Sequence, residues 1–264
     1  MNWGERQRTQ VKVTPPTLPE PGLQGMLAMI REDIEAVRGN DPAARDRIEI
    51  LTSYPGLHAI WMHRVAHALW GVGMTTRARM VSNLTRAITG VEIHPGAVLG
   101  RRVFIDHGMG VVIGETAVVG DDCLIYKGVV LGGTSLERTK RHPTLGAGVV
   151  VGSNACILGR VMIGDGAKVG SCSVVIRDMP AGATAVGVPG RIVSTTESHG
   201  PLDHGDLPDP IATVLRALLE QVEGLSERIE ALEGVQSADH REEEAELRAM
   251  RAELAAVIYE DFGD

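Results

Sequence analysis

The 264-residue chain contains few aromatic residues, only three cysteines and no long apolar run. Aromatics make up 3% of the sequence, so the core must be built from Val, Ile, Leu and Ala, which suits a repetitive fold with uniform spaces. Cys123, Cys156 and Cys172 form no C-x-x-C pair, which argues against a disulfide framework and a structural zinc site. We expect them to be small buried or half-buried residues in a reducing compartment.

Neither a membrane nor a nucleic acid is expected as a partner. No segment approaches the roughly 18 to 20 consecutive apolar residues needed to cross a bilayer, and residues 1–22 contain no apolar run of signal-peptide type. The formal net charge of -8 argues against affinity for phosphate backbones, which depends on clustered Lys and Arg. We therefore expect a soluble, cytoplasmic protein.

The first third of the chain divides into an arm and a helical region. Residues 1–22 are rich in proline and polar side chains, so we expect a flexible N-terminal arm. From residue 23 to 90, apolar residues recur at spacings of three and four, with breaks at 53–56 and 71–73. This pattern predicts an α-helical domain of three or four helices.

From residue 91 to 193 the period becomes six. An apolar residue begins each of thirteen hexads, many are followed by Gly, and the fourth residue after it is small or β-branched. The apolar residues are Ile93, Leu99, Ile105, Ile113, Val119, Ile125, Leu131, Leu145, Val151, Ile157, Ile163, Val169 and Val175.

A fixed short period predicts a solenoid of hexapeptide repeats, in which each unit supplies one short strand and a turn. Three units per coil give about four coils. The repeat is interrupted after Ile105 and at residues 135–144, and we expect these extra residues to project from the solenoid as a longer turn and a loop. Loops on a rigid scaffold are where binding and catalytic residues are commonly found.

After a polar linker at 194–210, the segment 211–264 is predicted to be helical. Apolar residues at alternating spacings of four and three form a heptad seam of about three heptads, which predicts a coiled coil and self-association. The alternative is a single amphipathic helix that lies on its own domain. A last acidic helical segment follows it.

Several polar residues interrupt the repeat where apolar or small residues would suffice. Glu92 and His107 are 15 residues apart, and we expect them on neighbouring rungs, where a carboxylate beside an imidazole makes a general base. Since no serine or cysteine of the chain is placed as their nucleophile, the nucleophile would belong to the substrate. The structural alternative is that His107 forms a hydrogen bond at a coil edge. His94, followed by Pro95, is expected to be structural.

Six motifs together resemble the serine O-acetyltransferase family over residues 23–195. They are "DPAA" at 41–44, "EIHPGA" at 92–97, "FIDHGMGVVIGETA" at 104–117, "GVVLGGT" at 128–134, "RHPT" at 141–144 and "VGVPGRIV" at 186–193. The resemblance implies a left-handed parallel β-helix and transfer of an acetyl group from acetyl-CoA to L-serine for cysteine biosynthesis. It also implies a homotrimer, or a dimer of trimers joined through the helical domains, with active sites between neighbouring β-helices.

The resemblance also implies roles for individual residues. His107 matches the general base of a direct transfer without metal, and Glu92 stands where many members have an orienting Asp. Asp41 and Asp106 match residues that hold the serine ammonium, while Arg141 and His142 match those that hold its carboxylate. The residues that match the acetyl-CoA site are Gly133, Thr134, Ser153, Lys168 and Ser171.

Two departures from the family and three alternatives remain. The loop "SLERTK" at 135–140 replaces a glycine-rich run, and the chain does not end in the isoleucine that enters cysteine synthase, which argues against a complex with that enzyme. One alternative is acetylation of another acceptor, such as homoserine or a sugar. Another is zinc-dependent hydration by His94, His107 and His142. The last is a non-catalytic trimeric scaffold.

Overall fold

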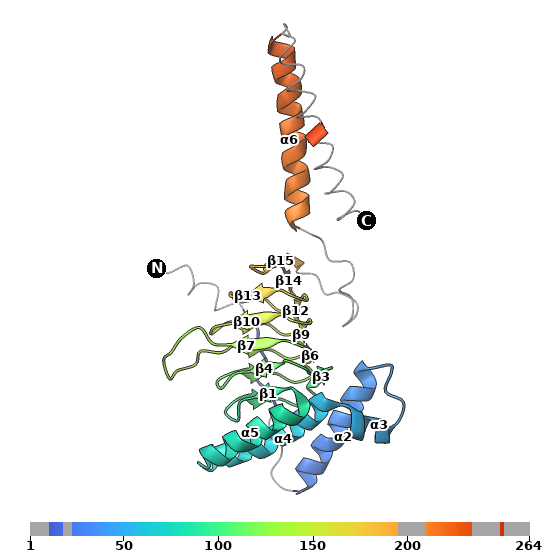
Figure 1. Cartoon of the computed structure of the whole chain (residues 1–264), viewed down its shortest axis with the longest axis vertical. Helices are drawn as coiled ribbons and strands as arrows, with labels where there is room; N and C mark the ends of the chain where they lie inside the picture. Colours follow the sequence, from blue (N-terminus) through green and yellow to red (C-terminus); the bar gives the residue numbers. More distant parts are fainter. Residues whose placement is uncertain (1–10, 18–22, 195–209, 234–248, 251–264) are drawn as a thin grey trace. The chain divides into compact units, whose positions relative to one another are not determined.

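The computed structural model describes residues 11–17, 23–194, 210–233 and 249–250. The chain divides into two units, residues 1–205 and 206–264, which are considered separately (Figure 1). Within the described ranges, no helix is both long enough and apolar enough to span a membrane.

Four helices occupy the region where the sequence predicts three or four. They are α2 (Leu23–Asn40), α3 (Arg47–Ser53), α4 (Pro55–Gly71) and α5 (Thr75–Thr89). Asp46 caps α3 by accepting hydrogen bonds from two backbone N–H groups, α4 begins with Pro55, and α5 ends at Gly90 in the left-handed conformation. These local signals set where α3 and α4 begin and where α5 ends.

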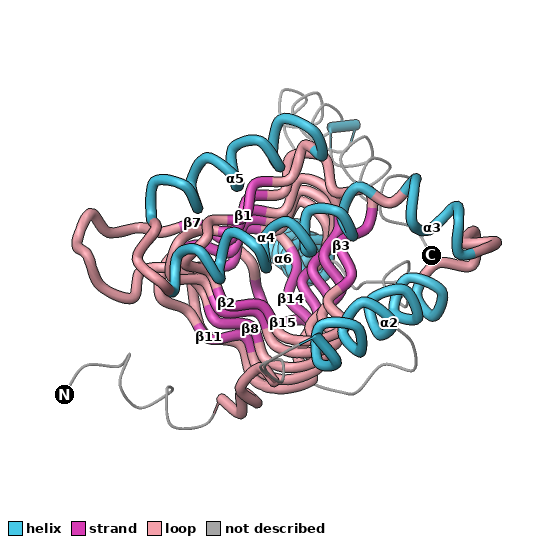
Figure 2. The backbone as a smooth tube through the Cα atoms, turned by 90° about the horizontal axis from the view of Figure 1, so that it is seen from below, coloured by secondary structure: helices cyan, strands magenta, loops and turns pink. Residues whose placement is uncertain are grey.

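The repeat region is a left-handed parallel β-helix, as the family resemblance implies. Its strands form three sheets, which are the three sides of a triangular solenoid. In the view along the solenoid axis, the strands of each sheet lie one above another (Figure 2). The five-stranded sheet contains β1 (Glu92–Ile93), β4 (Val112–Ile113), β7 (Val130–Gly132), β10 (Cys156–Leu158) and β13 (Val174–Val175). The four-stranded sheet contains β2 (Val98–Leu99), β5 (Val118–Val119), β8 (Thr144–Leu145) and β11 (Met162–Ile163). The six-stranded sheet contains β3 (Phe104–Asp106), β6 (Leu124–Tyr126), β9 (Val150–Val151), β12 (Lys168–Val169), β14 (Thr184–Val186) and β15 (Arg191–Ser194).

The hexad pattern corresponds directly to the core. Every apolar residue that begins a hexad is buried except Leu99, which is half-buried and packs against the same core. The five-stranded sheet has one strand per coil, so the solenoid has five coils rather than the estimated four. The strands pair in parallel throughout, apart from the antiparallel pair of β14 and β15.

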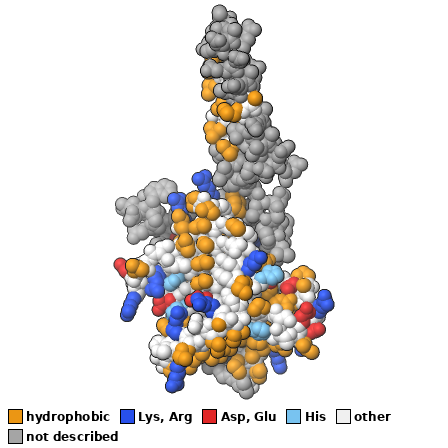
Figure 3. Space-filling model, in the orientation of Figure 1, with side chains coloured by type: hydrophobic (Ala, Val, Ile, Leu, Met, Phe, Trp, Pro, Cys, Tyr) orange, Lys and Arg blue, Asp and Glu red, His pale blue; other side chains and the backbone are white. Residues whose placement is uncertain are grey.

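The helices cover only part of the β-helix. Phe104, Leu124 and Val150, on the outer face of the six-stranded sheet, are buried in a second core with Val37 and Ile50 from the helices. By contrast, the outward aliphatic side chains of the other two sheets are half-exposed, among them Val98, Val112, Val118, Val130 and Val174. Figure 3 shows hydrophobic side chains in columns over the β-helix. Such columns are a typical surface for contact with another chain.

The described part of the N-terminal arm differs from the flexible segment that was expected. Residues 11–17 lie against the β-helix, because Thr14 donates two hydrogen bonds to the Asp165 carboxylate, at 2.7 and 2.6 Å. The backbone N–H of Thr17 donates to Asp121 at 2.9 Å, and that of Asp165 donates to the Lys12 carbonyl. Backbone groups, rather than apolar side chains, therefore attach this segment.

Helix α6 (Pro210–Glu233) lies where the heptad seam predicts a helix. The seam residues whose side chains are described are 38% to 55% exposed within the chain: Leu215, Leu218, Val222, Leu225 and Ile229. The predicted last helical segment lies outside the described residues, apart from residues 249–250.

Candidate active site

The candidate residues lie on two edges of the triangular β-helix. The His107 edge joins the six-stranded to the five-stranded sheet and contains the turns after β3, β6, β9 and β12. The loop edge joins the five-stranded to the four-stranded sheet and contains the turn after β4 and the long loop after β7. This loop projects from the coils in Figure 2.

The two-residue insertion after Ile105 builds the corner that carries His107. His107 has a φ of 59°, a left-handed conformation that turns the chain sharply after β3. Its side chain is 74% exposed, and its Nε2 lies 3.7 Å from Asp106 Oδ2. The imidazole therefore faces the space outside the β-helix, where a substrate can reach it.

Asp41 brings a second carboxylate to this corner. Tyr54, just before α4, donates a hydrogen bond to Asp41 Oδ2 at 2.6 Å, and burial together with this bond raises the pKa of Tyr54. Burial raises the pKa of the Asp106 carboxyl, and the charge of Asp41 adds to that effect. Tyr126 lies beside Asp106 in the next coil. Burial is the main cause of its raised pKa, and the negative charges of Asp106 and Asp41 raise the pKa further. The corner thus brings two carboxylates together, an arrangement suited to a cation.

Glu92 does not pair with His107 as the sequence spacing predicts. One coil here contains 18 residues plus the two inserted ones, so Glu92 stacks on Val112 in the next coil. Its Oε2 accepts a hydrogen bond from Arg86 Nη1 of α5 at 3.0 Å. In the described part of the chain, the carboxylate within ion-pair distance of His107 is Asp106.

The loop edge holds His142 and Arg141 in a fixed arrangement. His142 is 7% exposed, and its Nδ1 lies 2.9 Å from Thr116 Oγ1. The same hydroxyl oxygen accepts hydrogen bonds from the backbone N–H groups of Arg141 and His142. Arg141 Nη2 donates to Glu115 Oε2 at 2.6 Å. Burial, with the charges of Arg141 and Lys140, lowers the pKa of His142, which favours the neutral imidazole. Because Nδ1 accepts a hydrogen bond from the Thr116 backbone N–H at 3.2 Å, Nε2 carries the proton of the neutral ring.

Lys140 closes the base of the projecting loop. Its Nζ donates to the carbonyl oxygens of Thr116, at 2.5 Å, and Pro143, at 3.1 Å. Burial, and secondarily the charge of Arg160, lowers its pKa to about 8. A cavity of about 710 Å³ lies between the loop and Glu115, Thr116 and Arg141. The edge therefore presents donors beside a cavity large enough for a ligand.

Sequence reasoning did not identify Tyr54, Glu115 or Thr116 as part of the site. Glu115 and Thr116 lie in "GETA", the end of the family motif at 104–117, and this motif was the only sequence feature that could have pointed to them. Thr116 occupies an ordinary turn position of the repeat, so the pattern alone gave no reason to select it.

The residues expected to bind acetyl-CoA are divided between the two edges. Ser153 and Ser171 lie in turns of the His107 edge on later coils, where the Cys172 N–H donates to the Ser153 carbonyl. Gly133 and Thr134 lie on the loop edge, with Thr134 close to Gly159 of the next coil. Lys168 lies on β12 in the six-stranded sheet. Both edges therefore carry part of each expected binding site.

Within one β-helix, the His107 edge and the loop edge are too far apart to contact the same small molecule. They are separated by the width of the five-stranded sheet, which is roughly 10–15 Å at about 3.3 Å per residue. Asp106 and His107 lie on one side of that sheet, and Arg141 and His142 on the other.

The structure gives no support to a three-histidine metal site. Among the described residues, no three or more His, Cys, Asp or Glu side chains are grouped to hold a metal ion. His94 accepts a hydrogen bond from the Gly96 N–H and stacks edge-on with Trp70, which agrees with its expected structural role. His107 and His142 lie on different edges.

The chain is similar to known proteins over most of the β-helix and the helices before it. A profile described as "Bacterial transferase hexapeptide (six repeats)" matches residues 142–177. The serine acetyltransferase of Synechococcus elongatus is 50% identical over 208 residues, which cover 78% of this chain and 85% of the relative. That of Bacillus subtilis is 47% identical over 204 residues, which cover 76% and 94%.

Solved structures give the same result. The structure of soybean serine acetyltransferase complexed with serine is 43% identical, with a TM-score of 0.61 over 63% of this chain and 68% of that one. The Brucella abortus enzyme in complex with coenzyme A is 39% identical, with a TM-score of 0.63 over 64% and 68%. This chain therefore belongs to the serine acetyltransferases, a family of acyltransferase enzymes.

Proposed function

We propose that this protein transfers the acetyl group of acetyl-CoA to the hydroxyl of L-serine, giving O-acetylserine for cysteine biosynthesis. The observation that carries the proposal is the exposed His107 imidazole beside the two carboxylates of Asp41 and Asp106. The names of the relatives, and a solved complex of one relative with serine, agree with it.

Serine is a zwitterion, so its two charged ends need opposite partners. Asp41 and Asp106 supply acceptors for the ammonium group. Arg141 and His142 supply donors for the carboxylate, and His142 in its neutral form offers Nε2–H. Arg141 already binds a carboxylate in the free chain, that of Glu115, which the substrate carboxylate would replace.

His107 acts as the general base of a direct transfer. It takes the proton of the serine hydroxyl as the oxygen attacks the thioester carbonyl carbon of acetyl-CoA. The carbon–sulfur bond then breaks, and the CoA thiolate leaves and takes up the proton. General base catalysis of this kind contributes typically ~10² to 10⁴ in rate.

Glu92 orients His107 once substrate is bound. Its present partner, Arg86, is more than half exposed, and exposed ion pairs contribute about 0–1 kcal/mol, so little energy is needed to release the carboxylate. Catalytic hydrogen bonds are often long or unformed in a free enzyme and tighten with substrate. Acetyl-CoA lies along Ser153, Ser171 and Lys168 of one chain and Gly133 and Thr134 of another.

The active enzyme is a trimer in which each site lies between two chains. The His107 edge of one β-helix faces the loop edge of its neighbour, and three such head-to-tail contacts close a ring. The half-exposed aliphatic faces of the five-stranded and four-stranded sheets support this packing. The exposed seam of α6 supports a coiled coil that holds the trimer together.

Release of CoA thiol, measured with different acceptors, tests the reaction. We expect L-serine to support release from acetyl-CoA, and homoserine or sugars to support far less, because only a zwitterion with a short hydroxyl arm satisfies both charged groups. Equal rates with a sugar would reject the acceptor assignment.

His107→Ala tests the base. We expect the rate with serine to fall ~10² to 10⁴-fold, while the native mass and unfolding temperature stay unchanged because the side chain is exposed. Activity within a factor of a few of the unmodified enzyme would show that His107 is not the base.

A further inference from the structure

A cavity of about 330 Å³ lies where the helical region packs on the β-helix, away from both edges of the candidate active site. Residues of α2, α4 and β2 line it, together with Thr17 from the attached N-terminal segment. Its lining is mainly apolar and includes Met29 and Leu99. An apolar cavity of ~150 Å³ is enough to hold benzene, so this volume can hold a two-ring molecule.

His63 is the unusual residue in this cavity. It lines the space, is only 4% exposed, and its Nδ1 has no hydrogen-bond partner in the described part of the protein. Burial lowers its pKa to about 3, with smaller contributions from His67 and Arg64, so the ring is neutral. A buried polar atom without a partner costs about 1–3 kcal/mol, so its presence here calls for an explanation.

The backbone fixes which ring nitrogens are protonated. The Ala97 backbone stabilises the protonated form of His63, as a carbonyl acceptor does, and since Nδ1 has no partner the contact is with Nε2–H. This leaves Nδ1 as a bare acceptor. One turn along α4, His67 Nδ1 lies 2.7 Å from the Pro95 carbonyl and must donate to it, so Nε2 is a second acceptor whenever the ring is in its imidazole form. Both imidazoles line the cavity. His63 Nδ1 has almost no surface accessible to a water-sized probe, so an occupant must shift the atoms around this nitrogen to reach it as a donor.

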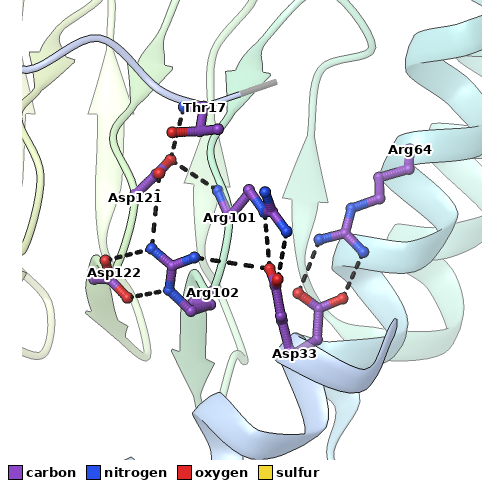
Figure 4. Close-up of polar contacts among 8 residues, drawn as sticks. Thr17, Asp33, Arg64, Arg101, Arg102, Asp121 and Asp122 are labelled. Atoms are coloured by element: carbon purple, nitrogen blue, oxygen red, sulfur yellow. Dashed lines mark hydrogen bonds and ion pairs between the residues drawn. The ribbon is translucent and has the colours of Figure 1, made fainter. Parts of the chain in front are cut away.

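The charged residues at the cavity are already neutralised. Arg64 binds Asp33 through two hydrogen bonds, and Arg101 binds Glu32 in the same way (Figure 4). Neither guanidinium is left to attract an anion, and the carboxylates are not left to attract a cation. The cavity therefore favours an uncharged occupant.

We propose that this cavity binds a small, neutral, largely apolar molecule that donates an N–H or O–H hydrogen bond to Nδ1 of His63. Aromatic alcohols and two-ring N-heterocycles such as indole have this chemistry and size. Two histidines one turn apart also resemble half of a metal site, but the described residues supply no third ligand. The inference does not depend on the proposed acetyl transfer, because binding is measured without either substrate.

Indole and benzofuran form a matched pair of probes, with the same bicyclic shape but an N–H donor in indole only. We expect calorimetry on the full-length protein to show indole binding roughly five- to a hundredfold more tightly than benzofuran. In the variant His63→Leu this preference should disappear. The variant should fold, because an apolar side chain removes a buried nitrogen that lacks a partner and gives up only the one contact with the Ala97 carbonyl. His58→Leu removes an imidazole of the same helix that does not line the cavity, and should keep the preference for indole.

Three results would overturn the proposal: neither probe binds, both bind equally, or the preference survives in His63→Leu. Stoichiometric zinc, nickel or copper in the purified protein, lost in His63→Leu, would also overturn it, because the occupant would then be a metal ion. Loss of acetyl transfer with intact indole binding would reject the proposed function and leave this proposal standing.

Discussion

Arg86 Nη1 lies 3.0 Å from Glu92 Oε2, where helix α5 meets the first strand of the β-helix. The carboxylate expected to orient the general base is thus held by a partly exposed arginine in the free chain. Two carboxylates are therefore candidates for the partner of His107: Glu92 after release from Arg86, and Asp106 as it stands.

Glu92→Gln and Asp106→Asn should separate these roles. If Glu92 orients the imidazole, Glu92→Gln lowers kcat roughly tenfold or more and leaves KM for serine nearly unchanged, because no contact with the substrate is lost. Asp106→Asn should mainly raise KM for serine, since one of the two ammonium acceptors loses its charge. Initial rates at varied serine concentration measure both.

Arg86→Gln serves as the control for this pair. It removes only the competing partner of Glu92, so kcat should stay the same or rise slightly. A fall in kcat as large as that of Glu92→Gln would mean that the ion pair itself, rather than a freed carboxylate, supports the site.

Thr116 is predicted to position His142. Thr116→Val removes an oxygen that accepts two backbone N–H groups and contacts His142 Nδ1, so we expect KM for serine to rise about tenfold. The free energy of unfolding should fall by about 1–3 kcal/mol. Thr116→Ser keeps the hydroxyl and should restore the KM. If both variants behave alike, the hydroxyl is not what orients the imidazole.

A site shared between chains predicts complementation between two inactive variants. His107→Ala and Arg141→Ala each damage a different edge, so each is inactive alone. Trimers formed from an equal mixture of the two unfolded variants should recover about a quarter of normal activity, since each mixed trimer contains one interface with both residues intact. No recovery in mixed trimers of confirmed composition would place both residues in one chain's site.

The hexapeptide core was predictable, whereas the contacts on its surface were not. An apolar residue every sixth position must point to the axis, so the buried set from Ile93 to Val175 follows from the sequence alone. The expected pairing of Glu92 with His107 stays a prediction, because Glu92 binds Arg86 here, while the turn that carries His107 lies beside residues 90–91. The insertion that forms the His107 corner makes the first coil 20 residues long, and a spacing of 15 then joins no stacked positions.

Site residues could be predicted where a polar side chain interrupts the hexapeptide repeat. They could not be predicted where the residue fits the repeat. Asp106, His107, Arg141 and His142 are polar at positions where the repeat needs none. Thr116 fits the repeat, and its importance lies in a hydrogen bond to a residue 26 positions later. Attachment of residues 11–17 was missed for the same reason, because backbone N–H groups, which every sequence has, make most of the contacts.

The attachment of the N-terminal segment should depend on pH through Asp165. Burial alone would raise the pKa of this carboxyl, but hydrogen bonds from Thr14 and Ala147 outweigh it and lower the pKa below its usual value. A carboxyl that is more acidic in the folded state stabilises the fold above its unfolded pKa of about 3.9, and this contribution is lost as pH falls through the folded pKa.

Asp165→Asn should therefore lower the unfolding temperature at pH 7, and the difference from the unmodified protein should shrink as pH falls below about 4. The Thr14 N–H and hydroxyl lose a charged acceptor in this variant, so trypsin should cleave after Lys12 faster at neutral pH. Asp178→Asn is the control, because Asp178 also accepts a backbone N–H at the end of the β-helix but does not touch residues 11–17. If that variant exposed Lys12 equally, general loosening of the solenoid, and not the Asp165 contact, would govern the segment.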